Sequence, residues 1–341
     1  MSSAVKQVRV IEGIAPDRIP VDELIASGIP AILKGAAADW PLVAKGRQSA
    51  KAAIDYLSSF DAARPVVGYT GEPEIGGRFF YNDDLTGLNF QGSRVGLTDF
   101  LARIAATLGD DQPPALYIGS TDLDAFLPGL RAENDLPSAL FGEHQPIASI
   151  WIGNRTVAST HYDFSNNIAC NMVGRRRFTL FPPDQIANLY PGPLEPTPGG
   201  QVVSMVDLRA PDFGRYPRFR QALDAAEVAE LEPGDLLIYP AMWWHNVEAL
   251  EPFNVMINYW WNAVPRFIDS PMTTLRHALL SLRDRPAHEK AAWRALFDYY
   301  VFGDGAAASA HLPDHARGPL GPMDEVTSRR LRADILNRLN R

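Results

Sequence analysis

The sequence predicts a mainly β fold, an antiparallel sandwich or barrel with helices packed at both ends of the chain. From about residue 145 to 265, short segments rich in β-branched and aromatic residues alternate with turn residues, and no helical pattern intervenes. This arrangement favours antiparallel sheets over alternating strands and helices. After Pro265, apolar residues recur at spacings of three and four, which indicates helices. The strand-like segments are ASIWIGN, NNIACNMVG, RRFTLFPP, GDLLIYP and VMINYWW.

The first part of the chain mixes helices with short strands. We expect helices at 21–27, 48–60 and 98–108, with Thr98 as the N-cap of the last one, and a strand at 29–34. The runs PVVGYT, RFFYN and ALYIGS are β-rich and bounded by turn residues.

Three parts of the chain are therefore expected. Residues 1–112 form an N-terminal α/β segment packed on the core, 113–265 form the β core, and 266–341 form a helical region. The amphipathic segment 272–302 has one apolar face, which serves either to pair two subunits or to pack on its own barrel. The sequence favours neither use.

Composition excludes several classes of protein. The 341 residues carry a formal net charge of −8, which argues against a surface that binds nucleic acid along its length. The single cysteine, Cys170, rules out an intramolecular disulfide and a cysteine-based zinc site, so we expect a cytoplasmic protein. We see no signal peptide and no run of about 18 apolar residues that would predict a membrane span.

A metal site is predicted by two separated motifs. His161 and Asp163 are two positions apart, which places both side chains on the same face of a strand. His245 follows a Pro-Gly-Asp turn at 233–235 and a buried strand at 236–239. A His-x-Asp pair also arises by chance, and a lone histidine beside tryptophans is more often a core residue. Two histidines and one carboxylate together predict the triad that binds Fe(II) in non-haem oxygenases.

Three arginines follow the first motif in an apolar run. We expect 166–173 and 177–183 to form a hairpin that turns at Gly174, with Arg176 pointing inward and Arg175 and Arg177 in solvent. A buried arginine is costly unless a carboxylate pairs with it. The alternative for Arg176 is a solvated place at the hairpin end.

The chain resembles the cupin-like Jumonji-C (JmjC) dioxygenases. The resemblance is carried by the strand-like segments given above and by HYDFSNNIACNMVGRRRFTLFPPDQIANLYPGP and PGDLLIYPAMWWHNVE. The asparaginyl hydroxylases that act on hypoxia-inducible factor are a similar branch. The likeness is dense over 113–265 and weaker on either side. It implies a double-stranded β-helix of the jelly-roll type that uses Fe(II), O2 and 2-oxoglutarate and releases succinate and CO2. In this branch the C-terminal helices pair two subunits, so a homodimer through these helices is one of the two uses expected for the segment.

The resemblance also assigns roles to individual residues. It implies that the metal ligands are His161, Asp163 and His245. It implies that the cosubstrate site is formed by Tyr117, Asn167, Arg176, Asn258 and Trp260. Arg176 stands where the branch has a lysine, which keeps the cation and changes the geometry of its donors.

Two departures from the pattern limit what the resemblance implies about the substrate. Position 158 is an alanine, whereas the family has a threonine there that contacts the cosubstrate. Ser159 or Thr160 replaces that threonine only if the strand shifts. The residues that hold the target asparagine have no clear counterpart, although Gln201 is a candidate.

A protein or peptide side chain is therefore the first expectation for the substrate, and the segment 79–84 is either a rim for it or a surface turn. Hydroxylation of a small molecule or an RNA base, or demethylation, is the alternative. A cupin-type sensor that binds without turnover, or a zinc or manganese cupin isomerase, is the alternative of another class.

Overall fold

A computed structural model describes residues 6–340 of the chain. The chain divides into two compact units, Met1–Ala263 and Val264–Arg341. The first unit contains all the strands of the described residues, and the second is helical.

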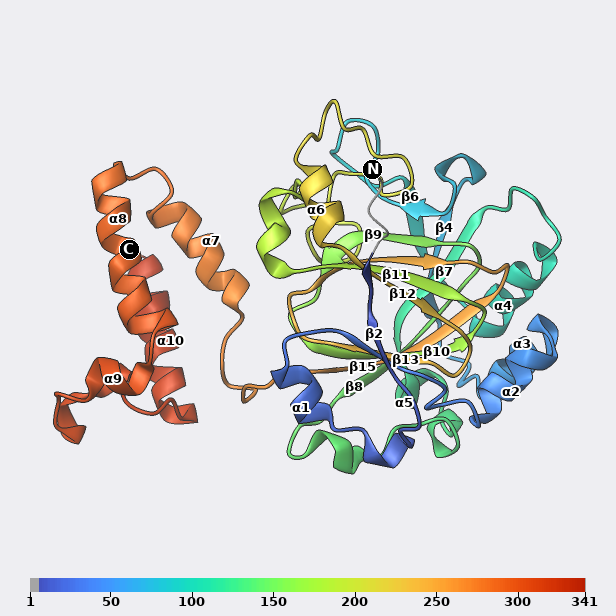
Figure 1. Cartoon of the computed structure of the whole chain (residues 1–341), viewed down its shortest axis with the longest axis horizontal. Helices are drawn as coiled ribbons and strands as arrows, with labels where there is room; N and C mark the ends of the chain where they lie inside the picture. Colours follow the sequence, from blue (N-terminus) through green and yellow to red (C-terminus); the bar gives the residue numbers. More distant parts are fainter. Residues whose placement is uncertain (1–5, 341) are drawn as a thin grey trace. The chain divides into compact units, whose positions relative to one another are not determined.

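Eight consecutive strands of the first unit form a double-stranded β-helix (Figure 1). They alternate between two facing sheets: β8, β10, β13 and β15 belong to the larger sheet, and β9, β11, β12 and β14 to the smaller one. Every pair of neighbours within these eight strands is antiparallel, as predicted. The bounds are β8 Ile147–Gly153, β9 Val157–Tyr162, β10 Asn166–Val173, β11 Arg176–Phe181, β12 Glu227–Leu231, β13 Leu236–Tyr239, β14 Trp244–Ala249 and β15 Asn254–Trp261.

The N-terminal segment extends both sheets. In the larger sheet, β3 and β2 continue beyond β13, and β7, β4 and β6 continue beyond β8. In the smaller sheet, β1 pairs with β12 and β5 pairs with β9. The bounds are β1 Lys6–Gln7, β2 Arg9–Ile11, β3 Ala31–Leu33, β4 Val66–Gly71, β5 Arg78–Phe79, β6 Phe90–Val95 and β7 Ala115–Asp122.

The larger sheet is buried on both faces because helices cover its outer side (Figure 1). Ile168, Cys170 and Met172 of β10 point outward into a core formed with α2, α3 and α4, whereas Ala169 points inward between the sheets. This period of two explains why β10 reads as a continuous apolar run. The helices of the first unit are α1 Val21–Ala26, α2 Pro41–Gln48, α3 Ala50–Ser58, α4 Leu97–Ala106, α5 Leu123–Phe126 and α6 Phe219–Ala225.

The expected hairpin at Gly174 is wrong. β10 pairs with β13 and β15 in the larger sheet, whereas β11 pairs with β12 and β14 in the smaller one. Gly174 has φ of 72° and carries the chain across from one sheet to the other, and the Asn171 Nδ2 donates to its carbonyl at 2.7 Å. Arg176 nevertheless points inward, because it shares the inner face of β11 with Phe178 and Leu180.

Two helix assignments also change. The expected helix at 48–60 is α3, which begins after Ser49 because the Ser49 side chain caps it, and the helix before it, α2, was not predicted. The N-cap of α4 is Gly96 rather than Thr98. Thr98 lies one residue inside the helix, and its amide and hydroxyl donate to the Asp61 carboxylate.

The second unit is helical, as its periodicity predicts. Its main elements are α7 Pro271–Ser281, α8 Ala287–Phe297, a π-helical turn Asp298–Phe302, α9 Gly305–Ser309 and α10 Glu325–Leu339. None of the residues of α7 or α8 is buried in the single chain. Within residues 6–340, no helix combines the length and the apolar character needed to cross a membrane.

Candidate metal centre and cavity

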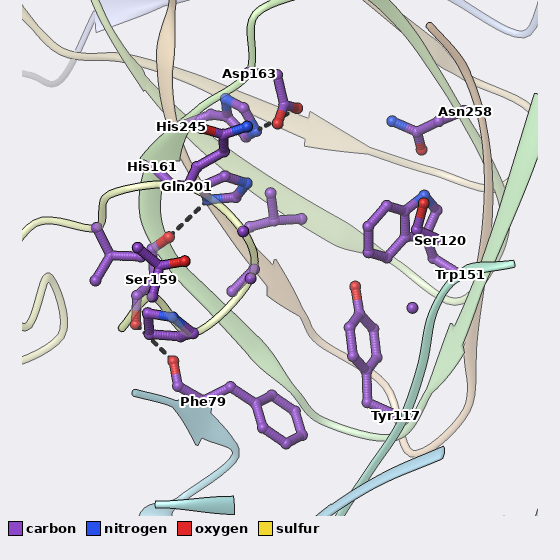
Figure 2. A pocket seen from close by; sticks show the side chains of 18 of the residues that line it. Phe79, Tyr117, Ser120, Trp151, Ser159, His161, Asp163, Gln201, His245 and Asn258 are labelled. Atoms are coloured by element: carbon purple, nitrogen blue, oxygen red, sulfur yellow. Dashed lines mark hydrogen bonds and ion pairs between the residues drawn. The ribbon is translucent and has the colours of Figure 1, made fainter. Parts of the chain in front are cut away.

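A cavity of about 630 Å³ opens between the two sheets of the first unit. Side chains from both sheets line it, together with the loop at 197–201. Six of the eight predicted site residues line this cavity, namely Tyr117, His161, Asp163, His245, Asn258 and Trp260. Figure 2 shows Asp163 and the two histidines on one side, and Tyr117, Trp151 and Asn258 opposite them.

The metal triad, His161, Asp163 and His245, comes together from two paired strands. His161 on β9 is the register partner of His245 on β14, and their ring centroids lie 4.3 Å apart. Asp163 lies just after β9, with its Oδ2 3.6 Å from the Nε2 of His245. One ligand atom from each residue lies within 4.8 Å of the others. Pairing of β9 with β14 thus brings together ligand residues that lie far apart in the sequence.

A β-bulge adjusts the triad. The register between β9 and β14 shifts between His245 and Val247, so one extra residue is accommodated in β9 between Ala158 and His161. Bulges are common next to active sites because they re-aim a side chain. Ala158, Ser159 and His161 all line the cavity as a result, but the Ser159 hydroxyl donates to the carbonyl of Phe79 at 3.0 Å.

Both histidines are held in the tautomer that a metal requires. The Nδ1 of His161 lies 2.8 Å from the carbonyl of Ser159, and the Nδ1 of His245 lies 3.0 Å from the carbonyl of Trp243. A carbonyl only accepts, so each Nδ1 carries a proton, and the Nε2 of a neutral ring keeps its lone pair for a metal. Burial lowers the pKa of His245 to about 4, and the neighbouring His161 adds to the effect. His245 is therefore neutral at pH 7.

The opposite side of the cavity is an aromatic wall, formed by Phe79, Tyr117, Trp151 and Trp260. Successive ring centroids lie 5.6, 5.9 and 5.6 Å apart. Burial raises the pKa of the Tyr117 hydroxyl, which stays protonated as a donor. The indole Nε1 atoms of Trp151 and Trp260 are buried and make no hydrogen bond within the described part of the chain.

Arg176 lies on β11 of the smaller sheet and does not itself line the cavity. Its side chain is 3% exposed, and its Nη1 lies 3.6 Å from the Sδ of Met256, which does line the cavity. Its Nε has no partner, and no carboxylate of residues 6–340 forms an ion pair with it. Burial lowers its pKa to about 10, although the nearby Tyr117 opposes that change. By contrast, Arg175 pairs with Glu251, and Arg177 with Glu230, at the surface.

A chain of three hydrogen-bonded side chains runs under the cavity. Asn258 donates from Nδ2 to the Oδ1 of Asn167 at 2.8 Å, and Asn167 donates from Nδ2 to the hydroxyl of Tyr239 at 2.7 Å. Asn167 is fully buried and does not line the cavity, whereas Tyr239 lines it with its ring centroid 5.1 Å from that of His245. The Tyr239 hydroxyl accepts from Asn167, so its own proton is free to donate elsewhere.

Sequence reasoning missed Tyr239 and Trp151. Tyr239 ends the strand LLIY, and its register partner on β10 is Asn167. Alternation along β13 places Leu237 and Tyr239 on the inner face, and this signal was readable from the sequence. Trp151 lies on the inner face of β8 by the same rule. Gln201, the candidate contact to a target amide, lies in the cavity beside His161 (Figure 2).

Comparison with known proteins agrees with this architecture. The sequence profile of the cupin-like domain matches residues 16–267. HSPB1-associated protein 1 from Homo sapiens is 36% identical over 121 residues, which is 35% of this chain and 24% of that protein. Lysine-specific demethylase JMJ31 from Arabidopsis thaliana is 30% identical over 147 residues, or 41% of this chain and 26% of that protein.

A third relative matches over a longer stretch. tRNA wybutosine-synthesizing protein 5 from Gallus gallus is 26% identical over 275 residues, which is 76% of this chain and 78% of that protein. The first two relatives are matched over only about a quarter of their own length.

Proposed function

The chain belongs to the cupin-like domain family, and from this premise we propose that it is an Fe(II)- and 2-oxoglutarate-dependent oxygenase. It hydroxylates a side chain of a protein or peptide and releases succinate and CO2. The observation that carries the proposal is the triad of two histidines and one carboxylate, in which the Nδ1 of each histidine faces a backbone carbonyl and the Nε2 is left for a metal. Two histidines and one carboxylate leave coordination positions open for a cosubstrate and oxygen.

His161, Asp163 and His245 would hold the iron, which supplies oxygen activation when bound. The carbonyls of Ser159 and Trp243 orient the two rings through their Nδ1–H groups. The two sheets enclose the cavity on two sides, which limits the access of water to chemistry that water would divert. No side chain is required as a general base.

The far side of the cavity fits the distal carboxylate of 2-oxoglutarate. Arg176 is a buried cation without a carboxylate partner among residues 6–340, and Tyr117 is a protonated hydroxyl next to it. A dicarboxylate that reaches Arg176 would pair the charge and remove the cost of its burial. Met256 is a flexible side chain between the cavity and Arg176, and it must shift to admit such a ligand. Trp260 adds an indole N–H donor that has no partner within residues 6–340.

A second substrate class, an RNA base, has one specific observation in its favour. The relative that covers three quarters of this chain is named for tRNA modification. The net charge of −8 weighs against it, because RNA affinity depends mainly on cations that meet the phosphates. We therefore keep the protein side chain as the leading substrate. The exposed apolar residues of the second unit, such as Leu280 and Phe302, support a homodimer, which analytical ultracentrifugation will test.

The enzyme is distinguished from a sensor by turnover of 2-oxoglutarate. The purified chain with Fe(II) and ascorbate is expected to form succinate slowly without a substrate, and removal of oxygen is expected to stop it. The Asp163→Ala variant is expected to form none. Binding of 2-oxoglutarate with no succinate in the wild type would identify a sensor instead. Oxygen-independent turnover with zinc or manganese would identify an isomerase.

A further inference from the structure

A second concave surface lies next to the cavity and is not explained by the proposed reaction. This surface, the arginine groove, has a volume of about 530 Å³. Its walls combine aromatic, proline and arginine side chains. The lining residues are Leu85, Ala187, Tyr190, Pro191, Gly192, Pro193, Met205, Arg215, Tyr216 and Arg218.

The arginine groove and the cavity share two walls. One is the strap, residues 190–205, whose 197–201 part lines the cavity while 190–193 and Met205 line the groove. Val203 of the strap pairs with His161 and accepts from the amide of Gly192 at 2.8 Å. The other is the turn at 82–88, where Leu88 lines the cavity and Leu85 lines the groove. Val203, which lines the cavity, and Met205, which lines the groove, are two positions apart, and two residues of extended chain span roughly 7 Å.

The aromatic side of the arginine groove is held firmly. Tyr190 has φ of 49°, a left-handed conformation that non-glycine residues adopt at a cost. Its hydroxyl accepts from the amide of Arg218 at 3.0 Å, and its ring packs edge-on against Tyr216 at 5.0 Å. Leu85, on the facing wall, also has a positive φ of 61°. Backbone strain of this kind collects at sites that clamp a ligand.

The cations of the arginine groove are exposed, and Arg218 donates from Nη2 to the carbonyl of Ala187 at 2.9 Å. Arg218 lies over the ring of Tyr190 at 4.8 Å, and Arg215 over the ring of Tyr216 at 5.3 Å. Neither forms an ion pair with any carboxylate of the described chain, and the same holds for Arg209 and Arg220 nearby. Planar guanidinium groups held in place by aromatic rings are suited to bidentate binding of carboxylates.

We propose that the arginine groove binds an acidic, extended peptide segment of the substrate, adjacent to the residue that is hydroxylated in the cavity. This inference rests on the proposed function for the reaction itself. Aromatic and proline walls suit an extended or polyproline chain, and the two arginines select acidic side chains along it. The shared strap lets one continuous peptide occupy both surfaces.

A nucleic acid fits the arginine groove less well. An arginine lies over one face of each tyrosine ring and the two rings pack edge-on against each other, which leaves less aromatic surface for stacking of a base. The exposed Asp83 and Asp84 flank Leu85 on the facing turn, where a continuous phosphate backbone would meet their charge. A peptide can place its acidic side chains singly against the arginines.

The test is direct binding of three labelled probes to the whole chain, followed by fluorescence anisotropy. The probes are a ten-residue Glu-Pro repeat, a Lys-Pro repeat of the same length and a ten-nucleotide oligouridylate. We expect the Glu-Pro probe to bind and the Lys-Pro probe not to bind. The double variant Arg215→Glu/Arg218→Glu is expected to weaken binding of the Glu-Pro probe at least about tenfold, because it reverses two charges.

The matched control is the double variant Arg64→Glu/Arg94→Glu, which makes the same charge change at two exposed arginines outside the groove. It is expected to bind like the wild type. Failure of the wild type to bind the Glu-Pro probe, or equal weakening in both variants, overturns the proposal. Tighter binding of oligouridylate through Arg215 and Arg218 would assign the groove to RNA instead.

Formation of succinate without substrate separates this inference from the proposed function. The Arg215→Glu/Arg218→Glu variant is expected to retain it, because neither arginine lines the cavity. If succinate is formed but the Glu-Pro probe binds equally to wild type and variant, only the groove assignment fails. If the probe result holds but no form of the chain produces succinate, the proposed reaction fails and the peptide site stands.

Discussion

The two sides of the cavity differ in how their polar groups are satisfied. On the metal side, the Nδ1 of each histidine has a backbone carbonyl as its partner, and Asp163 lies 3.6 Å from His245. On the aromatic side, polar atoms of Arg176, Trp151, Trp260 and Asn258 are buried, and none of these atoms has a partner within residues 6–340.

The polar groups of the metal side therefore orient the histidines, whereas those of the aromatic side are available to bind a ligand. On the metal side, hydrogen bonds fix the two histidine rings before any ligand binds, which is the preorganisation that metal sites require. The aromatic side leaves donors and a cation unsatisfied, which costs stability in the free protein and is recovered when a ligand pairs with them. Changes on the first side should therefore abolish metal binding, whereas changes on the second should alter ligand affinity and can stabilise the fold.

The largest effect is expected from removal of a metal ligand. Asp163→Ala is expected to weaken Mn(II) binding at least about a hundredfold, since even loss of a ligand's hydrogen-bonding partner costs 10–100-fold. Isothermal titration calorimetry measures this affinity. Asp184→Ala removes an exposed carboxylate elsewhere and is expected to bind like the wild type. Equal affinity in the two variants would show that the triad is not the metal site.

Replacement of Arg176 is expected to weaken the binding of 2-oxoglutarate and to stabilise the ligand-free fold. Arg176→Met is expected to raise the KM for 2-oxoglutarate by up to about a hundredfold, the equivalent of one charge-assisted hydrogen bond of about 1.5–3 kcal/mol. The same change removes an unpaired buried charge, so the ligand-free variant is expected to unfold at a higher temperature. Assays of succinate formation and thermal unfolding measure the two effects.

The matched control for the buried cation is Arg175→Met, which removes an exposed arginine paired with Glu251. Its KM is expected to stay within about twofold of the wild type, because exposed ion pairs contribute little. Indistinguishable KM values for the Arg176 and Arg175 variants would remove Arg176 from the cosubstrate site.

His245 should make the metal-free protein sensitive to acid. Its pKa is about 4 in the folded chain and 6.5 when unfolded, so the unfolded state binds the extra proton between these values. Stability is therefore expected to fall as pH drops from about 6.5 to about 4, by up to about 3 kcal/mol at 1.36 kcal/mol per pKa unit. Urea unfolding of wild type and His245→Gln across this range measures the difference. Parallel curves for the two proteins would contradict the assignment.

The smallest effect is expected in the amide chain beneath the cavity. Tyr239→Phe removes the acceptor of Asn167 Nδ2 and leaves a buried N–H unpaired, at a cost of about 1–3 kcal/mol. Tyr162→Phe removes a hydroxyl that makes no hydrogen bond to another side chain or to the backbone within residues 6–340, and it should change the free energy of unfolding by less than about 0.5 kcal/mol. Urea unfolding compares them, and equal losses would mean that the amide chain does not stabilise the fold.

Local patterns predicted much of the fold and of the site. The period of two along β10 and β13, the turn at 233–235 and the helical period after Pro265 all appear in the structure. Arg176 was placed inward for the wrong reason: alternation along β11 buries it, whereas the supposed hairpin does not exist. Thr98 failed as an N-cap because Asp61, distant in sequence, accepts from its amide and hydroxyl.

The sequence by itself determined which residues are candidates for the chemistry, because a His-x-Asp pair on a strand and a histidine after a buried strand are local signals. Only the tertiary structure decided how they meet: pairing of β9 with β14 brings His161 beside His245, and a bulge admits one extra residue next to them. The arginine groove is likewise tertiary, since it joins the turn at 82–88, the strap and the arginines before α6. Contacts between segments far apart in sequence depend on strand order and register, which local periodicity does not encode.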